Sequence, residues 1–381
     1  MQQTEVVTYC WHCFEHIFDI FTQFKKTELI PIGIATYVVG GGLYFFNIIM
    51  FINKQFIKNQ ERIRGNYIYQ IFVNLGGIIG ALLVVSNMDK VNEFKSCFTV
   101  GVISLLVALF LYPFMHDDDI SKIKIVKFYF YLILLFFIVL FAMHYQELTR
   151  IIVLSSFLVA SVYVIFLSFA KKNNNLLMFV GLVFAFNIPY WLANTIIFNQ
   201  FFYFLKNDVS ATVFNPLLIV IIDPLVNILF GIGMLGAQRK SIVNHYRNLT
   251  LSSLLLVCAF VILTIGLFFS KSRINFVYPM LMIGIFACAE FLLQTTLNSK
   301  IKDLLAHYKR GEFLATGIMR SSRSFATVLG YFLISFSAKH GGSTVSEVSA
   351  DFKLYCILLL VCLASFSSFR LARRFYMQVT P

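Results

Sequence analysis

Long apolar stretches, separated by short polar ones, run along almost the whole chain. Several exceed about 18 residues, the length that a helix needs to cross a hydrocarbon core about 30 Å thick. The pattern therefore predicts eleven membrane-spanning helices, joined by loops too short to hold a soluble domain. The predicted spans are residues 30–53, 66–87, 96–116, 124–145, 150–170, 176–204, 209–236, 250–270, 275–300, 313–338 and 352–372.

The composition agrees with this pattern. Of the 381 residues, 59% are hydrophobic and 13% are charged, whereas soluble domains carry roughly 25% charged residues. The chain is therefore predicted to be an all-α polytopic membrane protein. No P-loop, G-x-S-x-G or H-E-x-x-H pattern is present, so the sequence does not predict an enzyme.

The net charge of +13 comes from Lys and Arg in the short loops, which does not indicate a nucleic-acid partner. The loops on one side of the predicted bundle carry 19 of these residues, and those on the other side carry 10. Because cytoplasmic loops are enriched in Lys and Arg, the C-terminus is predicted to be cytoplasmic. We expect an integral protein of a bacterial inner membrane.

Residues 1–29 are predicted to form an amphipathic or irregular lead without the apolar core of a cleavable signal peptide. Cys10, His12 and Cys13 have the residue types of metal ligands, but a structural zinc site usually needs a second ligand pair. An interfacial helix with incidental Cys and His residues is the preferred interpretation. No metal and no other cofactor is predicted.

The stretch Phe214-Asn-Pro-Leu-Leu-Ile-Val-Ile-Ile-Asp-Pro224 places polar residues and prolines inside a predicted span. A carboxylate in lipid normally faces a partner or a wet cavity. Arg320 and Arg323, three residues apart on one face of a later span, are the predicted partners of Asp223. These three residues are interpreted as an intramembrane charge network, with a proton relay as the alternative, and Arg320 could instead extend to a headgroup.

Five segments carry motifs that match one family in the same order along the chain. Gly40-Gly-Gly-Leu-Tyr-Phe-Phe-Asn47, with Asn53-Lys-Gln-Phe56 after it, resembles the fourth-helix signature G-T-G-G-I-K-P-N … G-D-Q-F of the proton-dependent oligopeptide transporter (POT) family. That family belongs to the major facilitator superfamily. The other matches are Val73-Asn-Leu-Gly-Gly-Ile-Ile-Gly80 to its fifth helix, Asn215-Pro-Leu-Leu-Ile219 to its eighth, Ala289-Glu-Phe-Leu-Leu293 to its tenth, and Gly317 with Val328-Leu-Gly330 to its eleventh.

The resemblance implies a major-facilitator-like helix bundle that starts at the family's fourth helix, so that the first three helices are expected to be absent. Residues 30–116 would be the remnant of the N-terminal bundle. Residues 117–175 would form a linker with a two-helix hairpin, as in bacterial members. Residues 176–381 would form the six-helix C-terminal bundle.

The same resemblance implies a substrate-binding set of Asn215, Glu290 and Asn47. The family counterparts of Glu290 and Asn215 hold the amino terminus of the peptide, which suits a carboxylate facing an ammonium in a cavity of low dielectric. From the residues alone, both could also serve only helix packing through hydrogen bonds between helices.

Several groups that the family uses for proton coupling are replaced. The fourth-helix lysine falls on Phe45 and its proline on Phe46, and the seventh-helix glutamate falls near Leu192 and Ala193. The resemblance thus implies a carrier of di- and tripeptides or related small solutes whose coupling to the proton gradient is impaired. The alternative is a non-transporting membrane protein of the same fold.

The expected partners follow from this interpretation. They are a small peptide or peptide-like solute and the lipid bilayer. If the first three helices are absent, an N-terminal fragment or a second copy of the chain would be needed to close the cavity, because polar groups tolerate lipid poorly.

Overall fold

The computed structural model describes the central and C-terminal helices of the chain. The chain divides into two compact units, one of residues 1–55 and 80–152 and the other of residues 56–79 and 153–381, and most of the described helices lie in the second. The predicted domain boundaries at residues 117 and 176 stay predictions. The described residues are 59–86, 145–170, 174–210, 219–238, 245–269, 274–305, 311–340 and 354–367, with isolated positions between 130 and 141.

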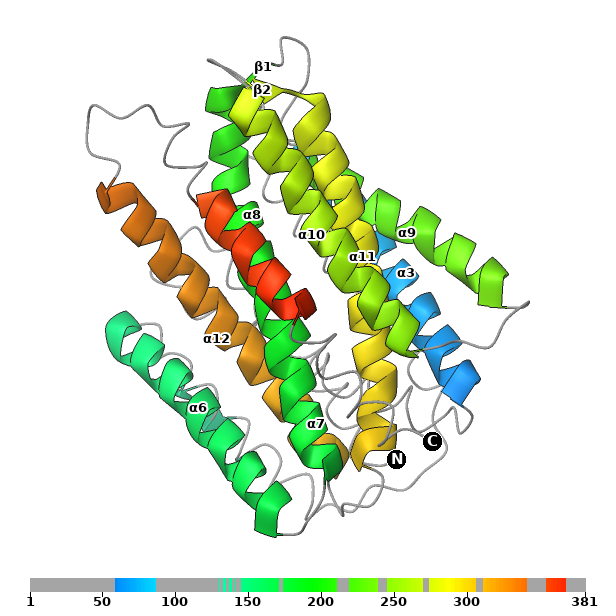
Figure 1. Cartoon of the computed structure of the whole chain (residues 1–381), viewed down its shortest axis with the longest axis vertical. Helices are drawn as coiled ribbons and strands as arrows, with labels where there is room; N and C mark the ends of the chain where they lie inside the picture. Colours follow the sequence, from blue (N-terminus) through cyan, green and yellow to red (C-terminus); the bar gives the residue numbers. More distant parts are fainter. Residues whose placement is uncertain are drawn as a thin grey trace. The chain divides into compact units, whose positions relative to one another are not determined.

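Long apolar helices make up the described part of the chain (Figure 1). Four of them, within 147–170, 176–198, 245–269 and 277–299, are long and apolar enough to cross a membrane. This confirms the predicted all-α membrane class. The elements are α3 (Asn59–Ser86), α6 (Gln146–Ala170), α7 (Asn174–Leu182), the π-helical turn η3 (Val183–Asn187), α8 (Ile188–Asp208), β1 (Val209–Ser210), α9 (Ile219–Gln238), α10 (His245–Phe269), β2 (Ile274–Asn275), α11 (Val277–Leu305), α12 (Gly311–His340) and a helix over Leu354–Ser367.

Most predicted spans in this part match a helix to within a few residues, and the span predicted from residue 209 opens with two residues that form a strand instead. Val209 and Ser210 form β1, which pairs in parallel with Ile274 and Asn275 of β2, and α9 is described over Ile219–Gln238. Backbone hydrogen bonds to a distant strand satisfy the polar groups that the prediction assigned to a helix. The apolar character of the segment did not reveal this pairing.

Helices α10 and α11 lie side by side along their lengths (Figure 1). Gly266 allows this approach at the β2 end, because a Cβ atom there would lie 2.6 Å from Cγ of Tyr278. Farther along, the Ser252 hydroxyl donates a 2.7 Å hydrogen bond to the Ala289 carbonyl. Small residues and hydroxyls at such crossings are typical of helix pairs in membranes. The contact places the residue after Ala289, Glu290, inside the bundle.

The helix predicted over 176–204 is interrupted by the π-helical turn η3. Pro189 follows it, and proline cannot donate to the carbonyl four residues earlier, which belongs to Ala185. The Ser365 hydroxyl, from the helix Leu354–Ser367, donates to that carbonyl. Hydroxyl side chains commonly satisfy backbone groups freed by proline in membrane helices. The irregular turn is thus held by a neighbouring helix.

Asn187, at the end of η3, links the continuous helix made of α7, η3 and α8 to α12. Its amide nitrogen donates to the Met319 carbonyl at 3.1 Å and to the Ser322 hydroxyl at 2.7 Å, and the residue is buried. Nearby, Gly330 of α12 lets Thr195 of α8 approach, since a Cβ at 330 would lie 2.9 Å from Cγ2 of Thr195. The two contacts fix the register of α8 against α12.

We expect Asn187→Ala to destabilise the protein by about 1–2 kcal/mol, because the hydrogen bonds that it makes cross between helices. Ser156→Ala is the matched control, since Ser156 is exposed and bonds only the Val153 carbonyl of its own helix. Unfolding of the purified protein in a mixed-detergent titration measures both variants. Equal stability of the two would show that the Asn187 contacts do not hold the helices together.

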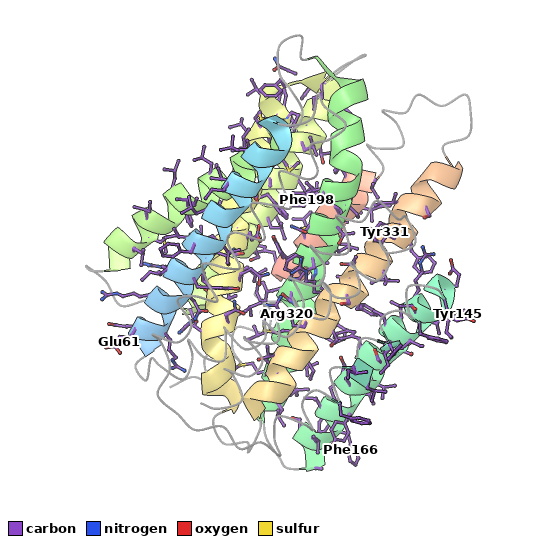
Figure 2. The ribbon with its side chains drawn as sticks, turned by 180° about the vertical axis from the view of Figure 1, so that it is seen from behind. Glu61, Tyr145, Phe166, Phe198, Arg320 and Tyr331 are labelled. Atoms are coloured by element: carbon purple, nitrogen blue, oxygen red, sulfur yellow. The ribbon has the colours of Figure 1, made fainter. Side chains whose placement is uncertain are left out.

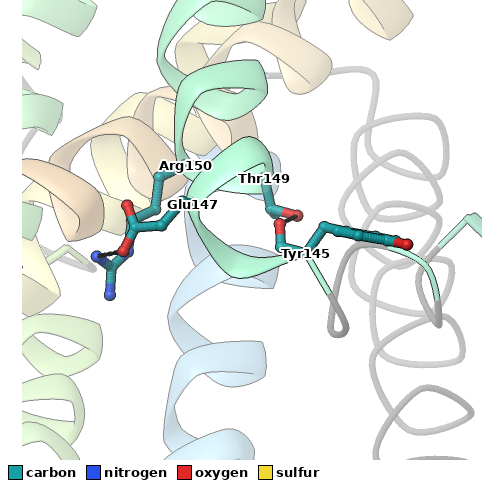
Figure 3. Close-up of polar contacts among 4 residues, drawn as sticks. All are labelled: Tyr145, Glu147, Thr149 and Arg150. Carbon is teal, nitrogen blue, oxygen red and sulfur yellow. Dashed lines mark hydrogen bonds and ion pairs between the residues drawn. The ribbon is translucent and has the colours of Figure 1, made fainter.

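Helix α6 carries large apolar side chains on its exposed surface. Phe166, labelled in Figure 2, is 68% exposed, and Val159 and Phe169 are exposed to the same degree. In the first turns of α6, Arg150 pairs with Glu147 at 2.8 Å, and the Thr149 hydroxyl donates to the Tyr145 carbonyl at 2.9 Å (Figure 3). An apolar exposed surface with polar groups gathered near one end suits a helix that faces lipid.

Candidate functional site

The candidate site is centred on Glu290, near the middle of α11. Its carboxylate interacts with Tyr190 of α8, Asn227 of α9 and Arg323 of α12. Asp223 of α9 faces the same carboxylate. Four helices therefore direct polar or charged side chains at one point within the apolar bundle.

Helical spacing explains how α9 and α11 meet there. Asp223 and Asn227 are four residues apart and share one face of α9, and Glu290 and Gln294 share one face of α11 in the same way. Because α9 packs against α11, the two polar faces oppose each other. The result is a polar strip between two otherwise apolar helices.

Aromatic side chains form the α8 side of the site. Tyr190 is completely buried and stacks on Phe286, with ring centroids 5.2 Å apart. The Asn194 amide donates to the Tyr190 hydroxyl at 3.2 Å. Trp191 meets the Tyr190 ring edge-on at 5.1 Å. These contacts hold the Tyr190 hydroxyl in place beside Glu290.

Two arginines of α12 lie at the site, three residues apart. The guanidinium carbon of Arg323 sits 3.6 Å from the centroid of the Trp191 ring, a cation–π contact that holds the charge in a weakly solvated position. Arg323 also attracts the Glu290 carboxylate. Arg320, labelled in Figure 2, interacts with Tyr69 of α3 and is repelled by Arg323.

Several polar atoms of the strip are buried without a hydrogen-bond partner. They are Oδ1 of Asp223 and Nε2 of Gln294. The Asn227 amide acts on the Glu290 carboxylate without reaching a well-formed hydrogen bond. Buried polar groups are nearly always paired, and each unpaired one costs about 1–3 kcal/mol. The strip thus offers both acceptors and donors to a ligand that carries complementary groups.

The structure describes four of the predicted site residues, which are Glu290, Asp223, Arg320 and Arg323. Glu290, Asp223 and Arg323 converge, and the predicted pairing of Asp223 with Arg320 or Arg323 stays a prediction. The charge of Glu290 acts on Asp223, and α9 packs on α11. Asn215 and Asn47 lie outside the described residues. The roles of all six residues stay predictions.

Four site residues were missed by the sequence prediction: Asn227, Tyr190, Trp191 and Gln294. Asn227 and Gln294 could have been found, because each lies four residues after a predicted site acid and so shares its helix face. Tyr190 and Trp191 carried no such signal. Their place depends on η3 and Pro189, which set the rotation of α8.

Helix α3 packs beside the strip at a tight crossing with α9 and α11. Gly231 of α9 faces Phe291 of α11, and a Cβ at 231 would lie 2.7 Å from Cε2 of that ring. Tyr67 of α3 packs on the same ring with centroids 5.0 Å apart, and its hydroxyl accepts a hydrogen bond from Asn248 at 3.5 Å. This aromatic contact borders the strip next to Glu290.

The chain was compared with known proteins. Neither a protein-family model nor a curated protein sequence matches it significantly. Solved structures do match, among them tetrameric PepTSo2, at 15% identity and TM-score 0.70 over 98% of this chain and 85% of that one. A bacterial homologue of the human drug peptide transporters PepT1 and PepT2 matches at 15% identity and TM-score 0.72, over 98% and 85% of the two chains.

A POT family transporter in complex with 5-aminolevulinic acid matches at 17% identity and TM-score 0.71, over 99% of this chain and 82% of that one. The chain has the fold of the POT transporters. The predicted POT-like helix bundle is thereby confirmed, and the proteins that share it are transporters rather than enzymes. The absence of the first three helices and the cytoplasmic C-terminus stay predictions.

Proposed function

We propose that the chain is a POT-like secondary transporter of di- and tripeptides or related small solutes that carry an amino group. The observation that carries the proposal is Glu290, a carboxylate inside the bundle that side chains from three other helices approach. A carboxylate inside a membrane span usually has a function, because burying its charge in lipid costs free energy that packing alone does not repay. Proteins of the same fold have been crystallised with alafosfalin and with 5-aminolevulinic acid.

In this proposal Glu290 accepts hydrogen bonds from the ammonium of the substrate. Charge-assisted bonds of this kind are about twice as strong as neutral ones. The buried amide of Asn227 offers a donor and an acceptor to the adjacent peptide group. Asn215, which the family resemblance assigns to the same end of the substrate, would complete the subsite. Transport would follow from rocking of one bundle against the other about this central site.

We further propose that coupling to protons in the manner of the family is impaired. At the position of the seventh-helix glutamate the chain has Leu192 and Ala193, both of which are buried in the apolar core. Neither can carry a proton. This favours either weakly coupled transport or the second candidate function, a membrane protein of the same fold that binds partners without transporting.

The test is uptake by proteoliposomes that contain the full chain. We expect saturable uptake of radiolabelled dialanine, competition by unlabelled di- and tripeptides, and weak competition by N-acetyl-dialanine, which lacks the ammonium. An imposed proton gradient should change the initial rate little. Co-reconstitution with the first three helices of a solved POT transporter tests whether the chain needs an N-terminal fragment.

Folded protein that neither takes up nor binds dialanine in either preparation would contradict the proposal. Binding without uptake in both preparations would support the non-transporting alternative. A large acceleration of uptake by an inward proton gradient would contradict the impaired coupling, but it would not contradict the proposal that the chain is a transporter.

A further inference from the structure

Arg323 places a positive charge deep inside the predicted span 313–338. It lies twelve residues after Gly311, the first residue of α12, and Glu290 lies fifteen residues before Leu305, the last residue of α11. At 1.5 Å per residue, these positions are about 18 and 22 Å from the ends at which the two helices follow each other in the chain. Because α11 packs against α12, the two charges lie at a similar depth, near the middle of a hydrocarbon core about 30 Å thick.

Arg323 points away from α6, the helix whose outer surface suits lipid. Phe325, two residues after Arg323, packs on Phe157 of α6 with ring centroids 4.7 Å apart. Two residues correspond to about 200° around a helix, so Arg323 lies nearly opposite the side of α12 that packs on α6. Figure 2 labels Arg320, one turn earlier, on the side of α12 away from α6. An arginine that lies within a span but does not face lipid is typical of a substrate or ion pathway.

Trp191 holds the Arg323 guanidinium in place. The guanidinium carbon lies 3.6 Å from the centroid of the Trp191 ring, and a stacked guanidinium keeps its N–H donors at the edge of its plane. The backbone beside it is also held, because the Thr327 hydroxyl donates to the Arg323 carbonyl at 3.0 Å and accepts from Thr195 of α8 at 3.3 Å. The Arg323 side chain is exposed, and within the described part of the chain it forms no ion pair with a carboxylate. Its donors can therefore bind an anionic group.

Tyr190 and Trp191 connect this arginine with Glu290. The Tyr190 ring stacks on Phe286 at 5.2 Å, and Glu290 lies four residues after Phe286, on the same face of α11. The Trp191 ring meets the Tyr190 ring edge-on at 5.1 Å. Consecutive residues of a helix point about 100° apart, so α8 presents Tyr190 to α11 and Trp191 to α12. An anionic and a cationic group thus lie on either side of one aromatic pair.

We propose that Arg323 binds the terminal carboxylate of the substrate while Glu290 binds its ammonium. A guanidinium pairs with a carboxylate through two parallel N–H···O bonds, and the contact with Trp191 orients it in advance. The substrate class is then a zwitterion with an amino group at one end and a carboxylate at the other. The proposal rests on the proposed function for the ammonium end.

Binding of such a substrate needs no proton. Glu290 and Arg323 carry opposite charges, and so do the two ends of a zwitterionic peptide, so the net charge of the site stays the same when the substrate enters. This agrees with the weak effect of a proton gradient that we expect for uptake.

The competing explanation is that Arg323 only balances the charge of Glu290. Dialanine and dialanine amide separate the two explanations, because the amide keeps the ammonium and replaces the carboxylate by a neutral group. Calorimetry with the purified chain measures both affinities. We expect the wild type to bind dialanine about tenfold or more tightly than the amide, since a charge-assisted pair is lost with the carboxylate.

Arg323→Gln should bring the ratio of the two affinities to about one. Arg323→Lys should keep a ratio smaller than that of the wild type, because a lysine ammonium lacks the planar fork of the guanidinium. Arg150→Gln is the matched control and should keep the wild-type ratio, since it removes an arginine from an exposed ion pair on α6.

A wild-type ratio of about one would overturn the carboxylate site and leave the proposed function intact. An unchanged ratio in folded Arg323→Gln would also overturn it, even if both affinities shift, because Arg323 would then act only through Glu290. If Arg323→Gln does not fold, an unchanged ratio in Arg323→Lys would overturn it instead.

Fluorescence of Trp191 gives a second measurement, since the sequence has one other tryptophan, Trp11. In a Trp11→Phe background, N-acetyl-dialanine, which has a carboxylate but no ammonium, should shift the Trp191 emission at high concentration. The shift should be absent when Arg323→Gln is added. Such a shift without tighter binding of dialanine than of N-acetyl-dialanine would contradict the proposed function and leave the carboxylate site standing. Folded protein that responds to none of the three ligands would contradict both.

Discussion

Glu290→Gln is expected to weaken binding of dialanine by on the order of 100-fold or more. The reason is that breaking a buried charge pair by removing one partner costs about 3–5 kcal/mol, and every 1.4 kcal/mol corresponds to about tenfold in affinity. Glutamine keeps the size of the side chain but presents an amide where the ammonium needs a carboxylate. Calorimetry or scintillation proximity binding with the purified chain measures the effect.

The controls separate loss of the subsite from loss of the fold. Glu147→Gln removes an exposed carboxylate and should bind dialanine as the wild type does. Asn215→Ala should weaken binding by a smaller factor, since a neutral hydrogen bond contributes about 0.5–1.5 kcal/mol. If folded Glu290→Gln binds with wild-type affinity, Glu290 serves helix packing and the substrate site lies elsewhere.

Gly231→Ala is expected to destabilise the protein by about 1–3 kcal/mol, the usual cost of overpacking a well-packed core. The added Cβ would lie 2.7 Å from Cε2 and 2.8 Å from Cζ of Phe291, and 2.9 Å from Cγ1 of Ile71. The ring of Phe291 has little freedom to move, because it packs against Tyr67 and Phe230 at the same time. The three helices must therefore separate slightly.

Gly233→Ala is the matched control, since it lies on the same helix and a Cβ there meets no atom within 4 Å. Alanine has a higher helix propensity than glycine, so this variant should be as stable as the wild type or slightly more stable. Mixed-detergent unfolding compares the two. If Gly231→Ala matches Gly233→Ala, the crossing of α3, α9 and α11 is looser than the distances indicate.

The fold was predictable because a membrane leaves few choices. Backbone groups in lipid must pair within their own segment, so an apolar run such as residues 275–300 becomes a helix, and α11 confirms this. The strand at Val209 was not predictable in this way. The hydrogen bonds of Val209 with the strand at Ile274 join segments that are far apart in the chain.

For the site too, some features were predictable from the sequence and others were not. An intramembrane acid such as Glu290 stands out in the sequence because its burial is costly, and its helical neighbours follow from a period of 3.6 residues. The partner of Asp223 stays a prediction, because the sequence does not say which helix faces which.

By itself, the sequence determined the membrane class, the positions of most described helices and the presence of charged groups within them, because the cost of burying polar groups in lipid acts on each segment separately. Only the tertiary structure decided that Asp223 and Asn227 come near enough to Glu290 to act on it and that Arg323 rests on Trp191. These contacts depend on the rotation and packing of whole helices. A helix turned by one residue about its axis would present different side chains to the same neighbour.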